Sequence, residues 1–329
     1  MIAYAIRSVL QAVLVLLAVA LLAFSMFRYV GDPVANMVGQ EATQGDREAL
    51  RERLGLDDPV LVQFGRFVAG AAQGEFGISY KQGRKVADLL AERLPATLEL
   101  AILSTLLAVA LGIVLGVYTA VRRDGVIANT VMVLSLVGVS LPTFVIGIGL
   151  IYLFAVELRW LPSYGRGEVV QIGWWTTGLL TESGRKSLIM PVLTLGFFQL
   201  TLIMRLVRSE MLEVMRTDFI KFARARGINE RSITFRHALR NTLIPVVTIA
   251  GLQFGGVVAF AIVTESVFQW PGLGALFVQA VQFVDIPVMA AYLMFVAAVF
   301  VATNLIVDLL YFALDPRLRN EAPAGAGGR

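Results

Sequence analysis

The stretch FARARGINERSITFRHALRNTLIP, from Phe222 to Pro245, is basic, contains a single glycine, and lies between two long uncharged runs of sequence. The run Leu188 to Met204 lies just before the basic segment Arg205 to Arg240, which contains most of this stretch, and the run Asn241 to Thr264 follows that segment at once. Uncharged runs of this length are typical of membrane spans. The basic stretch is therefore predicted to be a loop held between two membrane helices, so that anything docking on it acts on those helices directly.

The composition also favours a membrane protein. The 329 residues are 57% hydrophobic and only 16% charged, whereas soluble domains carry roughly a quarter charged residues. Runs without Asp, Glu, Lys or Arg cover Val9–Phe27, Leu100–Val121, Val126–Val156, Leu188–Met204, Asn241–Thr264 and Ile286–Val307. Because a span needs about 20 apolar residues and lipid offers backbone groups no partner, the sequence predicts an all-α integral membrane protein with six transmembrane helices.

Two of these runs need interpretation. The run Val126 to Val156 is longer than one perpendicular span and too short for two, so it is predicted to form one tilted helix kinked near Pro142. The first run is too long for a secretion signal, and Phe27-Arg28 offers no small-residue cleavage site. We therefore expect the first helix to be retained.

Several kinds of chemistry are excluded by the residues that the chain lacks. It has no Cys, its one His is His237, and it contains no G-x-x-x-x-G-K-[ST] loop. Disulfides and thiolate metal sites need cysteine, histidine-rich zinc sites need several histidines, and a P-loop ATPase needs the glycine-rich loop. The sequence therefore predicts a chain that is not an enzyme and that binds no metal or cofactor itself.

The distribution of charge predicts the orientation. Segments on the side of the N-terminus hold 15 basic against 8 acidic residues, a net of +7, and the other loops hold 13 against 15. By the positive-inside rule, both termini and the basic loop are predicted to be cytoplasmic, in a cell inner membrane. The overall charge of +4 thus needs no nucleic acid to explain it.

The chain is divided accordingly, with residues 1–27 as the first helix and 28–94 as a small outside domain containing an amphipathic stretch, Asp46 to Leu54. Residues 95–307 form the remaining five helices, with the cytoplasmic loop at 205–240. The cytoplasmic tail, 308–329, ends in the Gly- and Ala-rich segment Ala322 to Arg329, which is typical of disorder.

Within the basic loop we predict a helix to about Arg226, a break at Gly227, and a second helix beginning at Glu230 with Asn229 as its N-cap. One interpretation of this segment is a basic cytoplasmic loop whose charge only sets the orientation of the helices in the membrane. A DNA-binding helix-turn-helix is sterically excluded, because both ends are tethered to the bilayer. The small alanines and the rigid turn favour a docking site for another protein.

The residues of this loop resemble a known family. ARARG at Ala223 to Gly227 and RHALRNTLIP at Arg236 to Pro245 are similar to the cytoplasmic EAA loop of binding-protein-dependent ABC importer permeases, in the dipeptide/oligopeptide (DppB/OppB-like) branch. The acidic residue that names the wider family's loop is absent, with Lys221 near its place. Further segments that resemble this branch are LGLDDP (54–59), GEFGISY (74–80), ERLPATLEL (92–100), FQWPGLG (268–274) and ALDPRLR (313–319).

The resemblance implies the type I ABC importer (MetI-like) permease fold and a role as the permease subunit for di- and oligopeptides. Implied partners are a second, similar permease, two cytoplasmic ATPase subunits that hold ATP and Mg, and a periplasmic substrate-binding protein, besides membrane lipid. The loop would be a coupling helix seated in a groove of the ATPase. The contact and its support would comprise Ala223, Arg224, Ala225, Gly227, His237, Ala238, Leu239, Arg240 and Asn241.

Residues of the transport path are harder to identify. Gln253 is a candidate residue of the path, and the segment containing Trp270, Pro271, Gly272 and Gly274 is a candidate outer gate or binding-protein contact. Membrane glycines are more commonly used for close helix packing. Three acidic residues near span ends are expected to be interfacial anchors: Glu99, Glu265 and Asp308.

Other functions stay open at this point. A permease of the same branch could carry nickel complexes, glutathione or a glycoside. From another class, a membrane scaffold or receptor subunit could use the basic loop to dock a soluble partner without translocation. A secondary transporter is disfavoured because buried acids and histidines suited to proton coupling are scarce in the spans.

Overall fold

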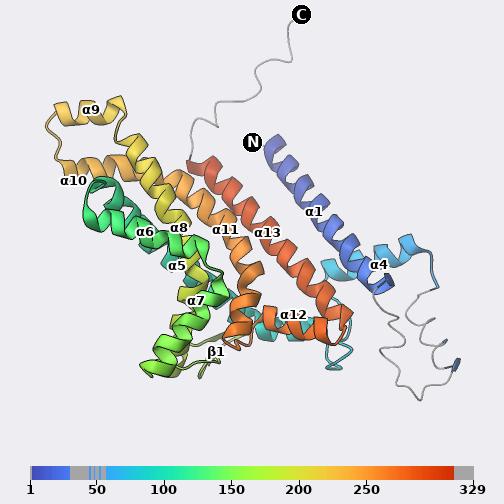
Figure 1. Cartoon of the computed structure of the whole chain (residues 1–329). Coiled ribbons are helices and arrows are strands. Elements are labelled where there is room, and N and C mark those ends of the chain that lie inside the picture. Colours follow the sequence, from blue (N-terminus) through green and yellow to red (C-terminus); the bar gives the residue numbers. More distant parts are fainter. Residues whose placement is uncertain (1, 30–43, 46–47, 49–51, 53–56, 315–329) are drawn as a thin grey trace, which may run out of the picture.

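A computed structural model describes residues 2–29, 44–45, 48, 52 and 57–314, and Figure 1 shows the arrangement of its helices. The helical elements are α1 (Ile2–Tyr29), α4 (Val60–Ala72), α5 (Val86–Val121), α6 (Val126–Ser140), α7 (Thr143–Leu150), η1 (Ile151–Glu157), α8 (Glu182–Val214), α9 (Asp218–Ala225), α10 (Glu230–Ser232), η2 (Ile233–Ala238), α11 (Leu239–Val267), α12 (Leu273–Gln282) and α13 (Ile286–Leu314). Two short antiparallel strands, β1 (Val170–Ile172) and β2 (Trp175–Thr177), pair with Gln171 opposite Thr176. The amphipathic stretch predicted at Asp46 to Leu54 lies outside the described residues except for Glu48 and Glu52, as does the C-terminal tail after Leu314.

The number of predicted spans agrees with the structure. Within the described part of the chain, five helices are long and apolar enough to cross a membrane, and a bent pair formed by α6 with α7 and η1 makes a sixth candidate. That pair corrects the prediction of one tilted helix, because its two halves meet at 110°. The break falls at the predicted position. Pro142 forces the preceding residue, Leu141, into an extended conformation with ψ 135°, which ends α6.

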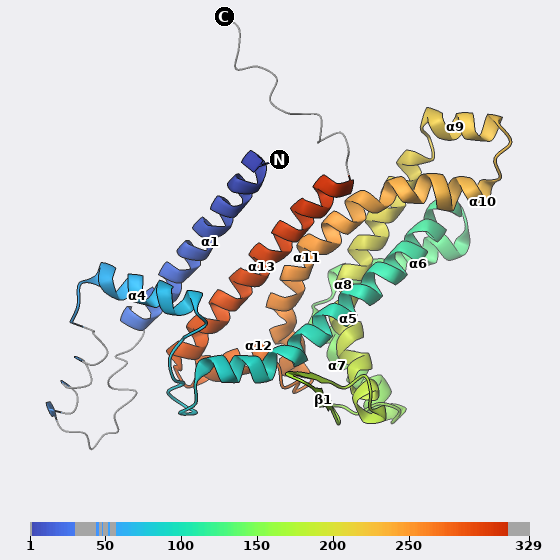
Figure 2. The ribbon, with the colours of Figure 1, turned by 180° about the vertical axis from the view of Figure 1, so that it is seen from behind.

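The centre of the bundle is the packing of α5 against α8. Ala108 and Val117 on α5 and Ile203, Val207 and Met211 on α8 belong to one buried apolar cluster. Gly112 and Gly116 allow the close approach, since a Cβ on Gly116 would lie 2.6 Å from Cβ of Val207. This is the use of membrane glycines expected from sequence. Figures 1 and 2 show α1 at one edge of the molecule, where it packs on α13 and α4.

The two ends of the bundle differ. The beginning of α1, the end of α13 and helix α9 lie at one end, which we call the α9 end (Figure 1). At the opposite α12 end, α12 and the first turns of α5 lie across the bundle, as Figure 2 shows, and α5 contains Pro95. Val86 and Leu89 of that crossing segment pack with Leu276, Ala280 and Val288 of α12 and α13. Helix α5 thus begins before residue 95, and its first part forms a layer with α12.

Candidate functional site

At the α9 end, the chain makes a separate short helix. The sequence predicts one helix continuing to about Arg226, but α8 ends at Val214 and α9 begins at Asp218. The Thr217 hydroxyl donates a 2.6 Å hydrogen bond to the carbonyl of Val214, and Thr217 is extended where α9 begins. The Thr217 side chain caps no N–H of α9, but Asp218 in the first turn complements the dipole of the new helix. Hydrophobic patterning did not predict this break.

The turn after α9 has the predicted geometry. Gly227 has φ +75°, and the backbone N–H of Ile228 donates to the carbonyl of Ala223 at 3.2 Å. This left-handed residue with its backward hydrogen bond is the glycine-terminated end of a helix. The Asn229 side chain accepts a 2.7 Å hydrogen bond from the N–H of Ser232. Both the break at Gly227 and the Asn229 cap are confirmed.

An ion pair fastens the two helices across this turn. Nε of Arg224 donates to Oε1 of Glu230 at 2.7 Å, and Nη2 donates to Oε2 at 3.3 Å. The hydrogen-bonded carboxylate raises the pKa of the Arg224 guanidinium above its ordinary value. Arg224, one of the predicted contact residues, is thus already paired within the chain.

The other expected contact residues divide into a buried and an exposed set. Ala223 and Ala238 are buried with Ile220 and Ile233, so these small residues bring α9 and η2 together. His237 and Leu239 are half-buried, and Ala225, Gly227, Arg240 and Asn241 are exposed. Asn241 donates to the carbonyl of His237 at 2.7 Å.

Sequence reasoning missed the aromatic residues of this end. Phe219, Phe222 and Phe235 are 47%, 65% and 57% exposed, which is unusual for side chains of that size. Phe235 lines an open hollow of about 450 Å³ together with Asn229, Arg231, Ser232 and Arg236. Aromatic residues interleaved with arginines were the available signal, because interfaces are enriched in both. The α9 end therefore presents a basic and aromatic surface around a rigid turn.

At the α12 end, a buried carboxylate organises the WPGLG segment. The Thr97 hydroxyl donates to Oε1 of Glu265 at 2.6 Å, and the N–H of Ala275 donates to Oε2 at 2.9 Å. A Cβ on Gly272 would collide with the Glu265 carboxylate. The glycine is therefore needed to admit the carboxylate to the start of α12, where a negative charge also complements the helix dipole.

The candidate gate residues lie in this buried cluster. Trp270 is fully buried, and its Nε1 donates to the carbonyl of Ala96 at 3.0 Å. Gln253 lies three turns earlier on α11, about 18 Å along the helix axis from Glu265. The structure thus brings Trp270, Gly272 and Gly274 together and leaves Gln253 apart from them.

A second carboxylate, Glu99, forms a buried ion pair in the same region. Its Oε2 accepts from Nη2 of Arg166 at 2.6 Å and from Nε at 3.2 Å. Its Oε1 accepts from the Thr177 hydroxyl at 2.7 Å and from the N–H of Gly178 at 3.0 Å. Arg166 also donates to the hydroxyl and the carbonyl of Thr176. The β1–β2 hairpin is therefore tied to α5.

These contacts correct the expectation that Glu99 and Glu265 are interfacial anchors. Glu99 is 4% exposed and Glu265 is 0% exposed, and each is surrounded by hydrogen-bond donors of the protein. Asp308, the third expected anchor, is half-buried and lies 3.4 Å from the hydroxyl of Ser8. The signal for a buried partner was present, since an acidic residue inside an apolar segment normally has one. No local pattern identified the partner as Arg166, 67 residues away.

Comparison with known proteins identifies the family. The family described as "binding-protein-dependent transport system inner membrane component" matches residues 112–320, and the N-terminal component of such systems matches residues 1–101. The dipeptide transport system permease protein of Alkalihalophilus pseudofirmus is 36% identical, covering 97% of this chain and 100% of that protein. A putative peptide transport system permease of Brucella abortus and the glutathione transport system permease of Escherichia coli are each 38% identical over 97% of this chain and 99% of their own length.

A solved structure supports the fold. A chain from the inward-facing MetNI methionine ABC transporter superposes with a TM-score of 0.55 at 21% identity, covering 69% of this chain and 96% of that chain. At 21% sequence identity, this similarity shows the fold alone. The fold is that of type I ABC importer permeases, as expected from sequence. With family matches over both halves of the sequence, the chain belongs to the binding-protein-dependent transport system inner membrane component family, as a non-catalytic permease subunit.

Proposed function

We propose that this chain is the permease subunit of an importer for dipeptides and oligopeptides. The observation that carries the proposal is similarity over 97% of the chain to permeases named for dipeptide and peptide transport. Glutathione is the second candidate substrate, because a glutathione permease is equally similar at 38% identity. Both candidates are short peptides or peptide-like molecules, so a path suited to a zwitterionic, extended substrate is common to them.

The partners follow from the role of such a subunit. Six helices form half of a pathway, so a second, similar permease is expected beside this one. Two ATPase subunits would hold ATP and Mg, and a periplasmic binding protein would deliver the substrate. The binding protein and the ATP-bound subunits would each bind the outward-facing state more tightly, which shifts the population toward it.

The α9 end is proposed as the cytoplasmic surface on which the ATPase docks. In support, the positive-inside charge count assigns the cytoplasm to this side. The loop Phe222 to Pro245 also combines a rigid turn at Gly227 with exposed aromatic and basic side chains such as Phe222 and Arg231. On this assignment both termini are cytoplasmic, and the segment 28–94 and the α12 end face the periplasm.

The test is reconstitution of the complete complex with its binding protein in liposomes. ATP hydrolysis is measured with dipeptides, longer peptides, glutathione, nickel complexes and glycosides as separate substrates. We expect stimulation by peptides and uptake of labelled peptide in proportion to it. Stimulation by another class and none by any peptide would refute the peptide assignment. A complex in which no binding protein or substrate changes hydrolysis would favour a scaffold without translocation.

A further inference from the structure

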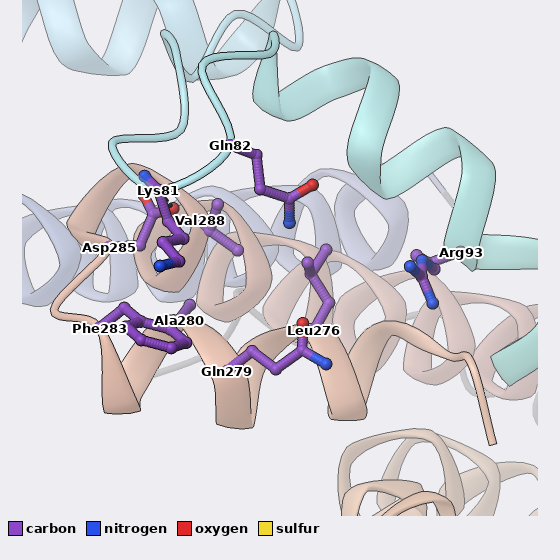
Figure 3. A pocket seen from close by; sticks show the side chains of 9 residues that line it. All are labelled: Lys81, Gln82, Arg93, Leu276, Gln279, Ala280, Phe283, Asp285 and Val288. Atoms are coloured by element: carbon purple, nitrogen blue, oxygen red, sulfur yellow. Dashed lines mark hydrogen bonds between the residues drawn. The ribbon is translucent and has the colours of Figure 1, made fainter. Parts of the chain in front are cut away.

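A polar pocket at the α12 end is not used by the features described above. It lies between the loop preceding α5 and helix α12, and has a volume of about 240 Å³. In Figure 3, Lys81 and Arg93 lie on opposite sides of the opening, and Gln82 and Gln279 reach toward it from its two walls. Four long polar side chains from three segments thus converge on one opening.

The groups lining this pocket favour an anion. Among the described residues, neither Lys81 nor Arg93 forms a salt bridge. Nζ of Lys81 lies 4.1 Å from the centre of the Phe283 ring, and Arg93 interacts at longer range with the buried Glu265. The one carboxylate of the lining, Asp285, is buried and has donors already.

Three neutral donors hold the Asp285 carboxylate. Its oxygens accept from the Ser79 hydroxyl and from the backbone N–H groups of Tyr80 and Lys81. Asp285 therefore fixes the loop, and its single negative charge leaves the lining with two cationic side chains against one carboxylate. An oxyanion in the opening would gain two cationic donors and the amide donors of the two glutamines.

The position of the pocket indicates which anion it meets. Candidate span α13 begins at Ile286, directly after Asp285, so the pocket lies at the level where the chain enters the apolar layer. Beside it, Val281, Phe283 and Val284 expose 46%, 54% and 40% of their surfaces. Basic side chains next to exposed apolar ones, at the depth of the headgroups, match a lipid with a charged head and an apolar tail.

We propose that this pocket binds the phosphate of an anionic phospholipid. The guanidinium of Arg93 and the ammonium of Lys81 hold the phosphate oxygens, the glutamine amides donate to the remaining lone pairs, and an acyl chain lies along the exposed apolar residues at the end of α12. A lipid held in this way would stabilise the packing of α12 against α5 and α13. The proposal does not depend on the identity of the transported substrate.

The test compares lipid retention by the full-length chain and by charge variants. Protein in nanodiscs of phosphatidylcholine with added phosphatidylglycerol is released into detergent, and bound phosphatidylglycerol is counted by native mass spectrometry. We expect Lys81→Gln and Arg93→Gln each to lower retention by about tenfold, the range for losing a charged hydrogen bond. The matched control is Arg66→Gln on α4, an exposed arginine paired with Asp58 at 2.7 Å, which should retain phosphatidylglycerol normally.

Three outcomes would overturn the proposal. Retention could be unchanged in both pocket variants, or it could fall equally in the Arg66 control. Alternatively, inorganic phosphate or acetate could raise the melting temperature of the protein in phosphatidylcholine alone as much as phosphatidylglycerol does, which would identify a site for a free anion. Gel filtration monitors folding, and Lys81→Gln, a change in a loop side chain, carries the test if Arg93→Gln does not fold.

Discussion

Replacing Arg166 by methionine removes one half of the buried ion pair that joins the β1–β2 hairpin to α5. The side chains of Arg166 and Glu99 are only 8% and 3% exposed, and the arginine supplies two of the four donors to the carboxylate. The variant leaves a buried carboxylate with the Thr177 hydroxyl and the Gly178 N–H as its donors. Loss of one partner of a buried pair costs about 3–5 kcal/mol, and we expect the free energy of unfolding to fall by that amount.

The matched control is an ion pair of similar length on the surface. Arg66 and Asp58 are 2.7 Å apart, but their side chains are 57% and 42% exposed. Solvent screens such a pair, and its loss costs at most about 1 kcal/mol. Arg66→Met and Arg166→Met remove the same group from the same end of the molecule, so the difference between them measures the effect of burial.

The assay is equilibrium unfolding in mixed detergent micelles, followed by tryptophan fluorescence. Trp270 is a suitable reporter, because its ring lies 5.8 Å from the Arg166 guanidinium carbon. The double variant Glu99→Gln with Arg166→Met removes both charges and should be more stable than the sum of the single losses predicts. If Arg166→Met costs no more than Arg66→Met, or if the two single losses simply add, the pair does not act as a buried unit and the reasoning is wrong.

Three further predictions concern the turns at the two ends. Gly227→Val places a β-branched residue at φ +75° and should cost about 1–2 kcal/mol of local conformational free energy. We expect this variant to insert normally into the membrane but to show reduced substrate-stimulated ATP hydrolysis in the reconstituted complex. Gly227→Asn, whose side chain tolerates this conformation, should keep most of that hydrolysis. Gly272→Ala should lower the melting temperature because its Cβ meets the Glu265 carboxylate, whereas Gly256→Ala, which meets nothing within 4 Å, should not. Asn229→Ala removes a helix cap and should cost about 1 kcal/mol by detergent unfolding; an unchanged value would mean that the cap is replaced by solvent.

Local features of the fold were predictable from sequence because their causes are local. Apolar runs fixed the spans by length, and the turn at Gly227 and Asn229 depends on conformational preferences of those two residues. The break between α8 and α9 was missed since its signal, a single Thr217-Asp218 pair, is weak against a long helical pattern. Pro142 predicted the place of the break within the third span. It did not predict the angle between the two halves, which depends on their packing against α8 and α11.

The polar cluster at the α12 end could not be predicted, because its members come from distant segments. Thr97 and Glu265 are 168 residues apart, and neither carries a pattern that specifies the other. From sequence, WPGLG was a candidate outer gate or binding-protein contact, and the segment carries no signal for the buried contacts that it makes. The structure selects close packing, because Gly272 admits a carboxylate and Trp270 has no exposed surface.

One helical segment connects the two ends of the molecule. From Glu230 to Val267, α10, η2 and α11 run through 38 residues without interruption, about 57 Å in an ideal helix. Near its far end, Glu265 is bound to α5 and α12, so a tilt of the segment moves both. Departures from regular helix, the π-helical turn η2 and Pro245, fall near the α9 end. A motion of α9 would be absorbed at these departures unless the ion pair between Arg224 and Glu230 holds α9 to the segment. We therefore expect this ion pair to contribute more to transmitting motion from α9 to Glu265 than to the free energy of unfolding.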